Sequence, residues 1–198
     1  IQGAGGVIIP PKTYWPRIEA ICRKHNILLV ADEVICGFGR TGHWFGHQAM
    51  GFKPDLITTA KGLSSGYLPI GAVLVSDKVT EGLLAGGEFN HGYTYSGHPV
   101  ACAVAIANIQ LMQSESIVKR VHDSIGPYLQ RRWSELADHP LVGETRGKGL
   151  VAALEIVQDK QTKRRFPAEL HAGMTCREFC FNNGLVMRAV GDTMIISP

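Results

Sequence analysis

Short apolar runs separated by glycine, proline and polar residues dominate the first half of the chain. Three of them, at about residues 27–30, 54–60 and 71–76, have the length and the Val, Ile and Leu content of buried strands. The segment 14–25 has apolar residues at helical spacing, with Pro16 in its first turn, where proline is tolerated. The first ten residues resemble a strand with its exit loop. This alternation predicts an α/β sheet with short crossovers.

The second half of the chain has a different pattern of apolar and polar residues. A glycine-rich loop at 86–97 leads into an apolar segment, 99–112, which predicts a helix buried on nearly all sides. We then expect an amphipathic helix at about 116–136, a strand within 145–156, a helix at 167–182 and a hairpin-like pair of strands within 185–198. We therefore expect residues 1–114 to form part of a larger domain and 115–198 a smaller, truncated α+β domain, both as a piece of a longer protein.

The composition is ordinary for a globular protein, with 45% hydrophobic residues, 19% charged residues and a net charge of +3. No apolar run has the length of a membrane span, and residues 1–11 lack the pattern of a signal peptide, so we expect a cytoplasmic protein without membrane contact. The basic run 160–165 lacks interleaved aromatic residues, so we expect no nucleic-acid partner. The five cysteines and eight histidines show no spacing typical of metal ligands or disulfides, so we expect no metal.

Two residues that end apolar runs carry the chemistry. Asp32 ends the run Leu28–Ala31, and Lys61 ends the run Leu56–Ala60. If both runs are parallel strands, both side chains emerge at the carboxyl edge of one sheet, where ligands bind. A lysine that forms a Schiff base, beside an acid that keeps a ring nitrogen protonated, is what pyridoxal phosphate chemistry requires.

Each of these residues also has an ordinary interpretation. A strand-end aspartate is often a turn former, and most lysines simply face solvent. The motif Gly37–Gly42 fits GxGxxG but is not followed by a clear helix or by an acid in the ribose position, which disfavours a dinucleotide fold. The pair Asp32 and Glu33 also resembles the magnesium-binding strand of a nucleotide-hydrolysing module, although the chain has no GxxxxGK[ST] loop. Glu33 itself would lie on the opposite strand face and serve as a salt-bridge partner.

Two further residues are candidates for binding anions. Thr94 lies in a loop of glycines and hydroxyl residues before the apolar helix, where its hydroxyl can bind a phosphate or cap the helix. Arg188 is a lone arginine within an apolar segment, and its planar fork suits a substrate carboxylate as well as a salt bridge.

Taken together, the motifs resemble one known family, the class III pyridoxal-phosphate-dependent aminotransferases. The resemblance spans nearly the whole chain. Two segments are similar to those of the ω-amino acid and diamine transaminases that use pyruvate, namely Asn90–Ser96 and Val186–Met194. The motifs of the family, in order, are Asp32–Val34, Gly37–Gly42, Pro54–Asp55, Thr59–Gly62, Pro69–Ala72 and Thr94–Pro99.

The resemblance implies a fold-type-I architecture and a role for each candidate. It implies that Lys61 is the aldimine lysine, that Asp32 pairs with the pyridinium nitrogen and that Val34 packs on the ring. It implies that Thr94 reaches the cofactor phosphate of the other subunit of a homodimer. Arg188 would bind the carboxylate of the keto acid acceptor and swing away for an amine donor. The family's phosphate loop and stacking aromatic residue lie outside these 198 residues, so we expect the chain alone to be inactive; a related aminomutase stays an alternative.

Overall fold

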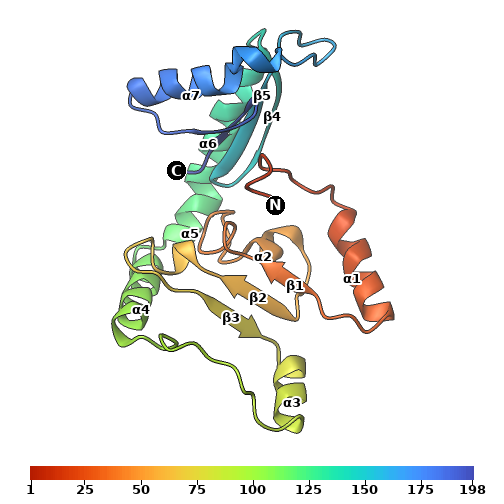
Figure 1. The fold of residues 1–198 in the computed structure, drawn as a ribbon, viewed down its shortest axis with the longest axis vertical. Coiled ribbons are helices and arrows are strands. Elements are labelled where there is room, and N and C mark those ends of the chain that lie inside the picture. Colours follow the sequence, from red (N-terminus) through yellow and green to blue (C-terminus); the bar gives the residue numbers. More distant parts are fainter. The chain divides into compact units, whose positions relative to one another are not determined.

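The computed structural model describes all 198 residues, and it divides into two compact units. One unit comprises residues 11–119, and the other comprises residues 1–10 together with 120–198. Each contains a β-sheet with helices, which confirms the α/β class (Figure 1). The predicted domain border at residues 114 and 115 concerns a longer protein and stays a prediction.

Helices and strands alternate along most of the chain, as the apolar pattern indicates. The helices are α1 (Tyr14–Lys24), α2 (Gly46–Met50), α3 (Asp77–Ala85), α4 (Pro99–Ser114), α5 (Ile117–Arg120), α6 (Gly126–Glu135) and α7 (Ala172–Asn182), with short turns of other helix types at Lys61–Leu63, Val121–Ile125, Leu136–Asp138 and Ala168–Leu170. The strands are β1 (Val30–Asp32), β2 (Leu56–Thr59), β3 (Ala72–Val75), β4 (Val142–Lys148), β5 (Val151–Ile156), β6 (Arg188–Val190) and β7 (Thr193–Ile196).

The sheet of the unit 11–119 has the strand order β1-β2-β3 (Figure 1). β1 and β2 are parallel, with Val30 opposite Leu56 and Asp32 opposite Thr58. β3 is antiparallel to β2. The parallel pair requires a long connection, and that connection contains the glycine-rich turn at 37–42 and the short helix α2.

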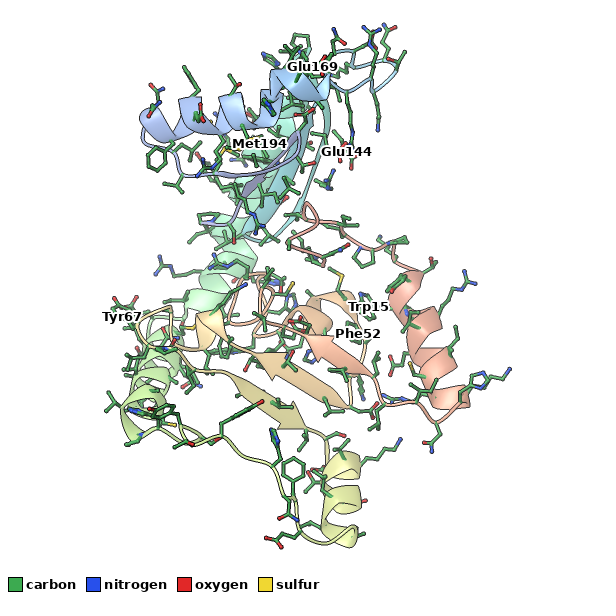
Figure 2. All side chains as sticks on the ribbon, viewed as in Figure 1. Trp15, Phe52, Tyr67, Glu144, Glu169 and Met194 are labelled. Carbon is green, nitrogen blue, oxygen red and sulfur yellow. The ribbon has the colours of Figure 1, made fainter.

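A small core joins α1 to this sheet. Cys22, Leu29, Ala31 and Phe52 are buried together. The rings of Trp15 and Phe52 are stacked with their centroids 3.9 Å apart (Figure 2). This packing explains why α1 has one apolar face.

The buried carboxylate of Asp55 fixes the start of both parallel strands. Its two oxygens accept hydrogen bonds from Arg23 Nη1 at 2.9 and 2.8 Å, and Oδ2 also accepts one from the Leu29 amide at 2.8 Å. Burial raises the pKa of this carboxyl, but the hydrogen bonds and the charge of Arg23 outweigh burial, and the net effect is a lowered pKa. Asp55 therefore ties α1, β1 and β2 together as an anion.

The second unit contains a four-stranded antiparallel sheet with the order β4-β5-β7-β6. Alternate residues of β5 point to opposite faces, as strand geometry requires. Ala152 and Leu154 pack with Trp133 of α6, and partly buried Cys176 and Cys180 of α7 join this cluster. On the other face Val151 and Ala153 pack with Val7. The small residues of β5 thus allow packing on both faces.

Several local expectations differ from the structure. The expected single strand within 145–156 is a hairpin, because Gly149, at a φ of +61°, turns the chain between β4 and β5. The first ten residues form only an isolated bridge between Gln2 and Ile8. Helices α2 and α3 were not expected, since α2 is very short and α3 has no buried residue.

The expectation that residues 99–112 are buried on nearly all sides is wrong for this chain. In α4 only Ala101, Ala105 and Met112 are buried, while Val100 is 56% and Ile106 55% exposed. The helix contains no charged residue, yet most of its residues are exposed.

No single helix is long and apolar enough to span a membrane. Only α4 taken together with the helical segment Ile117–Asp138, to which it is bent by 52°, has the length and composition for one.

The ion pair at Asp55 predicts a specific dependence of stability on pH. The pKa of Asp55 is lower in the folded state, so its contribution is complete above the unfolded value of about 3.9 and is lost as pH falls through the lower folded value. We expect the free energy of unfolding from urea titrations to fall between pH 5 and pH 2 (about the range of carboxyl titration). Asp55→Asn should be less stable at pH 7 and show a smaller fall. Equal falls in both proteins would contradict this role.

Candidate active site

The parallel pairing of β1 and β2 brings the two predicted chemical groups to one edge of the sheet. Asp32 is the last residue of β1 and lies opposite Thr58 of β2. The Glu33 amide continues the ladder by donating to the Thr58 carbonyl at 2.9 Å. Lys61 follows the end of β2 after one residue, Ala60. A carboxylate and an amine thus emerge from neighbouring carboxyl ends, as the sequence predicts.

The Asp32 carboxylate is exposed and only partly used within the chain. Its Oδ1 accepts a hydrogen bond from the amide of Val34 at 3.0 Å, which fixes the direction of the side chain at the strand end. Val34 is half-buried beside it. The remaining carboxylate oxygen has no hydrogen-bond donor in this chain and is available to a ligand.

Lys61 begins a tight turn with an unusual backbone. Its φ is +41°, in the left-handed region that residues with a side chain rarely adopt. The turn is closed by hydrogen bonds from the Leu63 amide to Ala60 O at 2.9 Å and from the Ser64 amide to Lys61 O at 3.2 Å. The Lys61 side chain is exposed and has no hydrogen bond or ion pair. Such local strain is typical of functional positions.

Glu33 lies on the face of β1 opposite to Asp32, as expected, and is only 3% exposed. Its carboxylate accepts hydrogen bonds from the amides of Gly46 at 2.7 Å and His47 at 2.6 Å, and the ring Nδ1 of His47 lies 3.2 Å from Oε1. These bonds satisfy amides of the first turn of α2. Glu33 therefore has a structural role in holding α2 against the sheet.

The glycine-rich segment 37–42 forms a compact turn closed by backbone hydrogen bonds. The amide of Phe38 donates to Trp44 O at 2.6 Å, and that of Gly39 to His43 O at 3.1 Å. The helix that follows, α2, has only five residues. This geometry supports the prediction that the GxGxxG match is not a dinucleotide site. Burial lowers the pKa of Arg40 in this turn.

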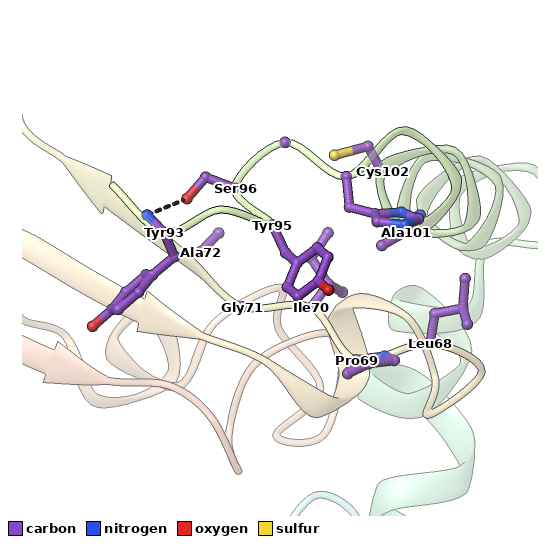
Figure 3. A pocket seen from close by; sticks show the side chains of 12 residues that line it. Leu68, Pro69, Ile70, Gly71, Ala72, Tyr93, Tyr95, Ser96, Ala101 and Cys102 are labelled. Carbon is purple, nitrogen blue, oxygen red and sulfur yellow. Dashed lines mark hydrogen bonds between the residues drawn. The ribbon is translucent and has the colours of Figure 1, made fainter. Parts of the chain in front are cut away.

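Thr94 lies in a fully exposed loop between α3 and α4. The loop is shaped by a hydrogen bond from the Tyr93 amide to Ser96 Oγ at 3.1 Å, and His98 caps α4 through its ring Nδ1, which accepts from the Ala101 amide at 3.4 Å. A cavity of about 640 Å³, lined mostly by carbon atoms, separates this loop from the segment Leu68–Ala72 (Figure 3). Thr94 does not line that cavity.

Arg188 is the first residue of β6, in the other unit. Its side chain is exposed and forms no salt bridge or hydrogen bond within the chain. The interpretation of Arg188 as a structural salt bridge of the small lobe therefore has no support in the structure. Its guanidinium is free to bind an external carboxylate.

The structure thus places Asp32, Val34, Lys61 and Thr94 in the unit 11–119, and it brings the first three to one strand edge. One contact to this site was not predicted from the sequence. Asn108 of α4 donates hydrogen bonds to the backbone just after Lys61. The available signal was a polar amide that interrupts the apolar run 99–109 of an uncharged helix.

Comparison with known families and proteins gives consistent results. Residues 1–197 match the family model of aminotransferase class III. The chain is 64% identical over 198 residues to putrescine–pyruvate aminotransferase of Pseudomonas aeruginosa, covering all of this chain and 43% of that protein. It is 46% identical over 202 residues to the mitochondrial gamma aminobutyrate transaminase 1 of Solanum lycopersicum, covering 39% of that protein.

Solved structures agree with the sequence matches. An (S)-enantioselective omega-transaminase from Thermomicrobium roseum superposes with a TM-score of 0.94 at 46% identity, covering all of this chain and 44% of that one. A transaminase from the marine bacterium Virgibacillus gives a TM-score of 0.95 at 40% identity, covering all of this chain and 46% of that one. The fold is therefore that of the fold-type-I transaminases, and the chain spans less than half the length of the relatives it matches.

The buried position of Glu33 predicts a large structural effect of its removal. Glu33→Ala would leave the amides of Gly46 and His47 without their acceptor, so we expect a loss of about 3 kcal/mol in the free energy of unfolding. Glu81→Ala, at an exposed position of α3 without an ion pair, is the matched control and should change stability by less than about 0.5 kcal/mol. Urea denaturation measures both, and equal stability of the two variants would contradict the assignment.

Proposed function

This chain belongs to the class III aminotransferase family, and from that premise we propose that the protein containing it is a pyridoxal-phosphate-dependent transaminase. The amino donor would be a diamine, an ω-amino acid or another primary amine, and the acceptor a keto acid, with pyruvate favoured. The observation that carries the proposal is that the exposed Lys61 and the partly free carboxylate of Asp32 follow neighbouring parallel strands at one edge of the sheet. The substrate classes follow the 64% identical putrescine–pyruvate enzyme.

The groups present fit the cofactor in part. A free amine, a carboxylate with an open oxygen and a neighbouring aliphatic side chain at Val34 match its aldehyde, ring nitrogen and ring face. When bound, pyridoxal phosphate would supply an electron sink for a carbanion at the substrate carbon. The same residues give no support to a nucleotide-hydrolysing module, because Glu33 is fully engaged in holding α2.

Each residue would then have a distinct task. Lys61 Nζ would be the covalent attachment point and, once released, would move a proton to and from the substrate carbon. Asp32 would hold a proton on the ring nitrogen through charge and hydrogen bonding. Val34 would fix the plane of the ring by contact. The reaction would have two half-reactions, the first taking an amino group from the donor and the second giving it to the keto acid.

The exposure of the loop that carries Thr94 supports a homodimeric arrangement. Its loop is exposed over its whole length and makes few contacts within its own unit, so its hydroxyl is available to a phosphate outside this chain. We propose that it reaches the cofactor phosphate of a second subunit. The exposed apolar residues of β3 and α4 are consistent with a chain that covers 43% of its relative and is inactive alone. A cytoplasmic location is part of the same proposal.

Arg188 would distinguish the two substrates. An exposed guanidinium without an internal partner can bind a keto acid carboxylate in two parallel hydrogen bonds, and it costs no internal salt bridge when it turns away for an amine. This behaviour would allow one enzyme to accept both substrates. An aminomutase of the same family would need no second keto acid.

The attachment of the cofactor can be tested directly. The full-length protein that contains this chain is incubated with pyridoxal phosphate and reduced with borohydride, and peptide mass spectrometry locates the pyridoxyl group. We expect the label on Lys61 alone and no label in Lys61→Ala. Asp32→Asn should still be labelled but should lose most of its transaminase activity, by roughly 100-fold or more, because the ring nitrogen loses its anionic partner. Label spread over surface lysines such as Lys78 would refute the proposal.

The role of Arg188 predicts an effect on one substrate only. Arg188→Ala should raise the KM for pyruvate roughly 10- to 100-fold, the value of a lost charged hydrogen-bond pair. The KM for a diamine donor should stay within about twofold of the wild-type value, because a diamine has no carboxylate for Arg188 to bind and a twofold change is smaller than the loss of a hydrogen bond causes. Arg132→Ala, which removes an exposed arginine of α6, is the control. Steady-state kinetics with both substrates varied gives these values, and an equal rise for donor and acceptor would exclude dual recognition by Arg188.

A further inference from the structure

The segment that follows Lys61 is held by one side chain from a distant part of the sequence. Asn108 Nδ2 donates hydrogen bonds to Gly62 O at 2.8 Å and to Leu63 O at 3.1 Å. Its Oδ1 accepts a third hydrogen bond, from Ser65 Oγ at 2.8 Å. A single half-buried amide on α4 therefore binds three of the four residues that follow Lys61.

This segment needs support because its backbone is strained at two places. Lys61 has a φ of +41° and Ser65 a φ of +50°, and neither is a glycine. Each such residue costs of order 1 kcal/mol or more and persists only where its surroundings hold it. The hydrogen bonds to Asn108 involve the residues between these two positions, so they oppose relaxation of the turn to an ordinary conformation.

The turn is also packed against a second side chain. A Cβ added at Gly62 would lie 2.9 Å from the Cβ of Phe38, so the backbone of residue 62 lies directly against that side chain. Phe38 belongs to the glycine-rich turn after β1. The backbone after Lys61 is therefore in contact with both Phe38 and Asn108, while the lysine side chain itself has no hydrogen bond or ion pair.

From this geometry we propose that Asn108 is a positioning residue, which keeps the backbone of Lys61 in the orientation from which its amine reaches the cofactor and the substrate carbon. The inference rests on the proposed role of Lys61. Asn108 would not touch substrate or cofactor, because its polar atoms are used by Gly62, Leu63 and Ser65.

The position of Asn108 gives this contact a second consequence. Helix α4 begins at Pro99, directly after the loop that carries Thr94. Asn108 therefore fixes the Lys61 turn to the same rigid element from which the proposed phosphate-binding loop emerges. A proton transfer by Lys61 requires its amine to be placed within hydrogen-bond reach of the reacting carbon, so small displacements of the turn affect the chemical step more than substrate binding.

The first test needs no activity. Hydrogen exchange of the cofactor-free full-length protein is measured by mass spectrometry on the peptide that contains residues 61–67. We expect Asn108→Ala to raise the exchange rate of this peptide about tenfold, which corresponds to about 1.4 kcal/mol. Asn183→Ala is the matched control, because Asn183 also donates a side-chain hydrogen bond to a carbonyl, that of Phe179 at 2.8 Å, in the other unit. It should leave the 61–67 peptide unchanged.

The second test uses the enzyme loaded with pyridoxal phosphate. Asn108→Ala should lower kcat about tenfold and leave the KM of both substrates within about twofold. The pH at which the lysine-bound cofactor changes its absorbance should also shift, which a merely structural role would not cause. Ser65→Ala removes only the hydrogen bond to Oδ1 and should show the same changes to a smaller extent, and it replaces Asn108→Ala if that variant does not fold.

The outcomes separate this inference from the proposed function. Unchanged exchange of the 61–67 peptide, or a kcat within twofold of the wild type in Asn108→Ala, would overturn the role of Asn108 while borohydride labelling of Lys61 in the wild type still stands. Absence of that label in the wild type would instead refute the role of Lys61 itself. Equal effects of Asn183→Ala and Asn108→Ala would show a general loss of stability and also overturn the inference.

Discussion

The parallel pairing of β1 with β2 is the constraint on which the candidate site depends. With Asp32 opposite Thr58, the two strands end at the same edge, and the residues that follow them are brought together without any contact between their side chains. A shift of one residue in this register would turn Asp32 toward the buried face and Glu33 toward the edge. Asp55 secures the register at the other end of the strands, since its carboxylate binds Leu29 before β1 and itself precedes β2.

The same edge shows how two adjacent acids acquire different roles. Asp32 keeps one carboxylate oxygen without a donor in this chain, whereas both oxygens of Glu33 accept hydrogen bonds from α2. The alternation of side chains along a strand decides which of them faces a ligand and which supports the structure. The connection between β1 and β2 is then held by Glu33 rather than by a large apolar core.

The sequence indicated the parts of the site that depend on local pattern. Asp32 and Lys61 could be found because each ends an apolar run, and the order of strand, helix and strand predicts the parallel edge. The contact of Asn108 with Gly62 joins residues 46 positions apart, so no local pattern could reveal it. The apolar pattern predicts one strand in place of the hairpin of β4 and β5, because the turn with Gly149 interrupts that pattern only briefly. The exposure of α4 could not be predicted. Its apolar composition indicates that the helix is suited to burial, but it does not indicate which segments cover it.

The contacts of the first residues have a consequence for how the chain is made. Val7 is 1% exposed and packs on Val151, Ala153 and Ile195, and Arg146 Nε donates to Gly6 O at 2.9 Å across 140 positions of sequence. During synthesis residues 1–10 leave the ribosome long before the strands that bury them. Contacts between distant segments form slowly. The packing of Val7 therefore cannot be completed until nearly all of the C-terminal sheet has emerged, and apolar segments without partners tend to aggregate in that interval.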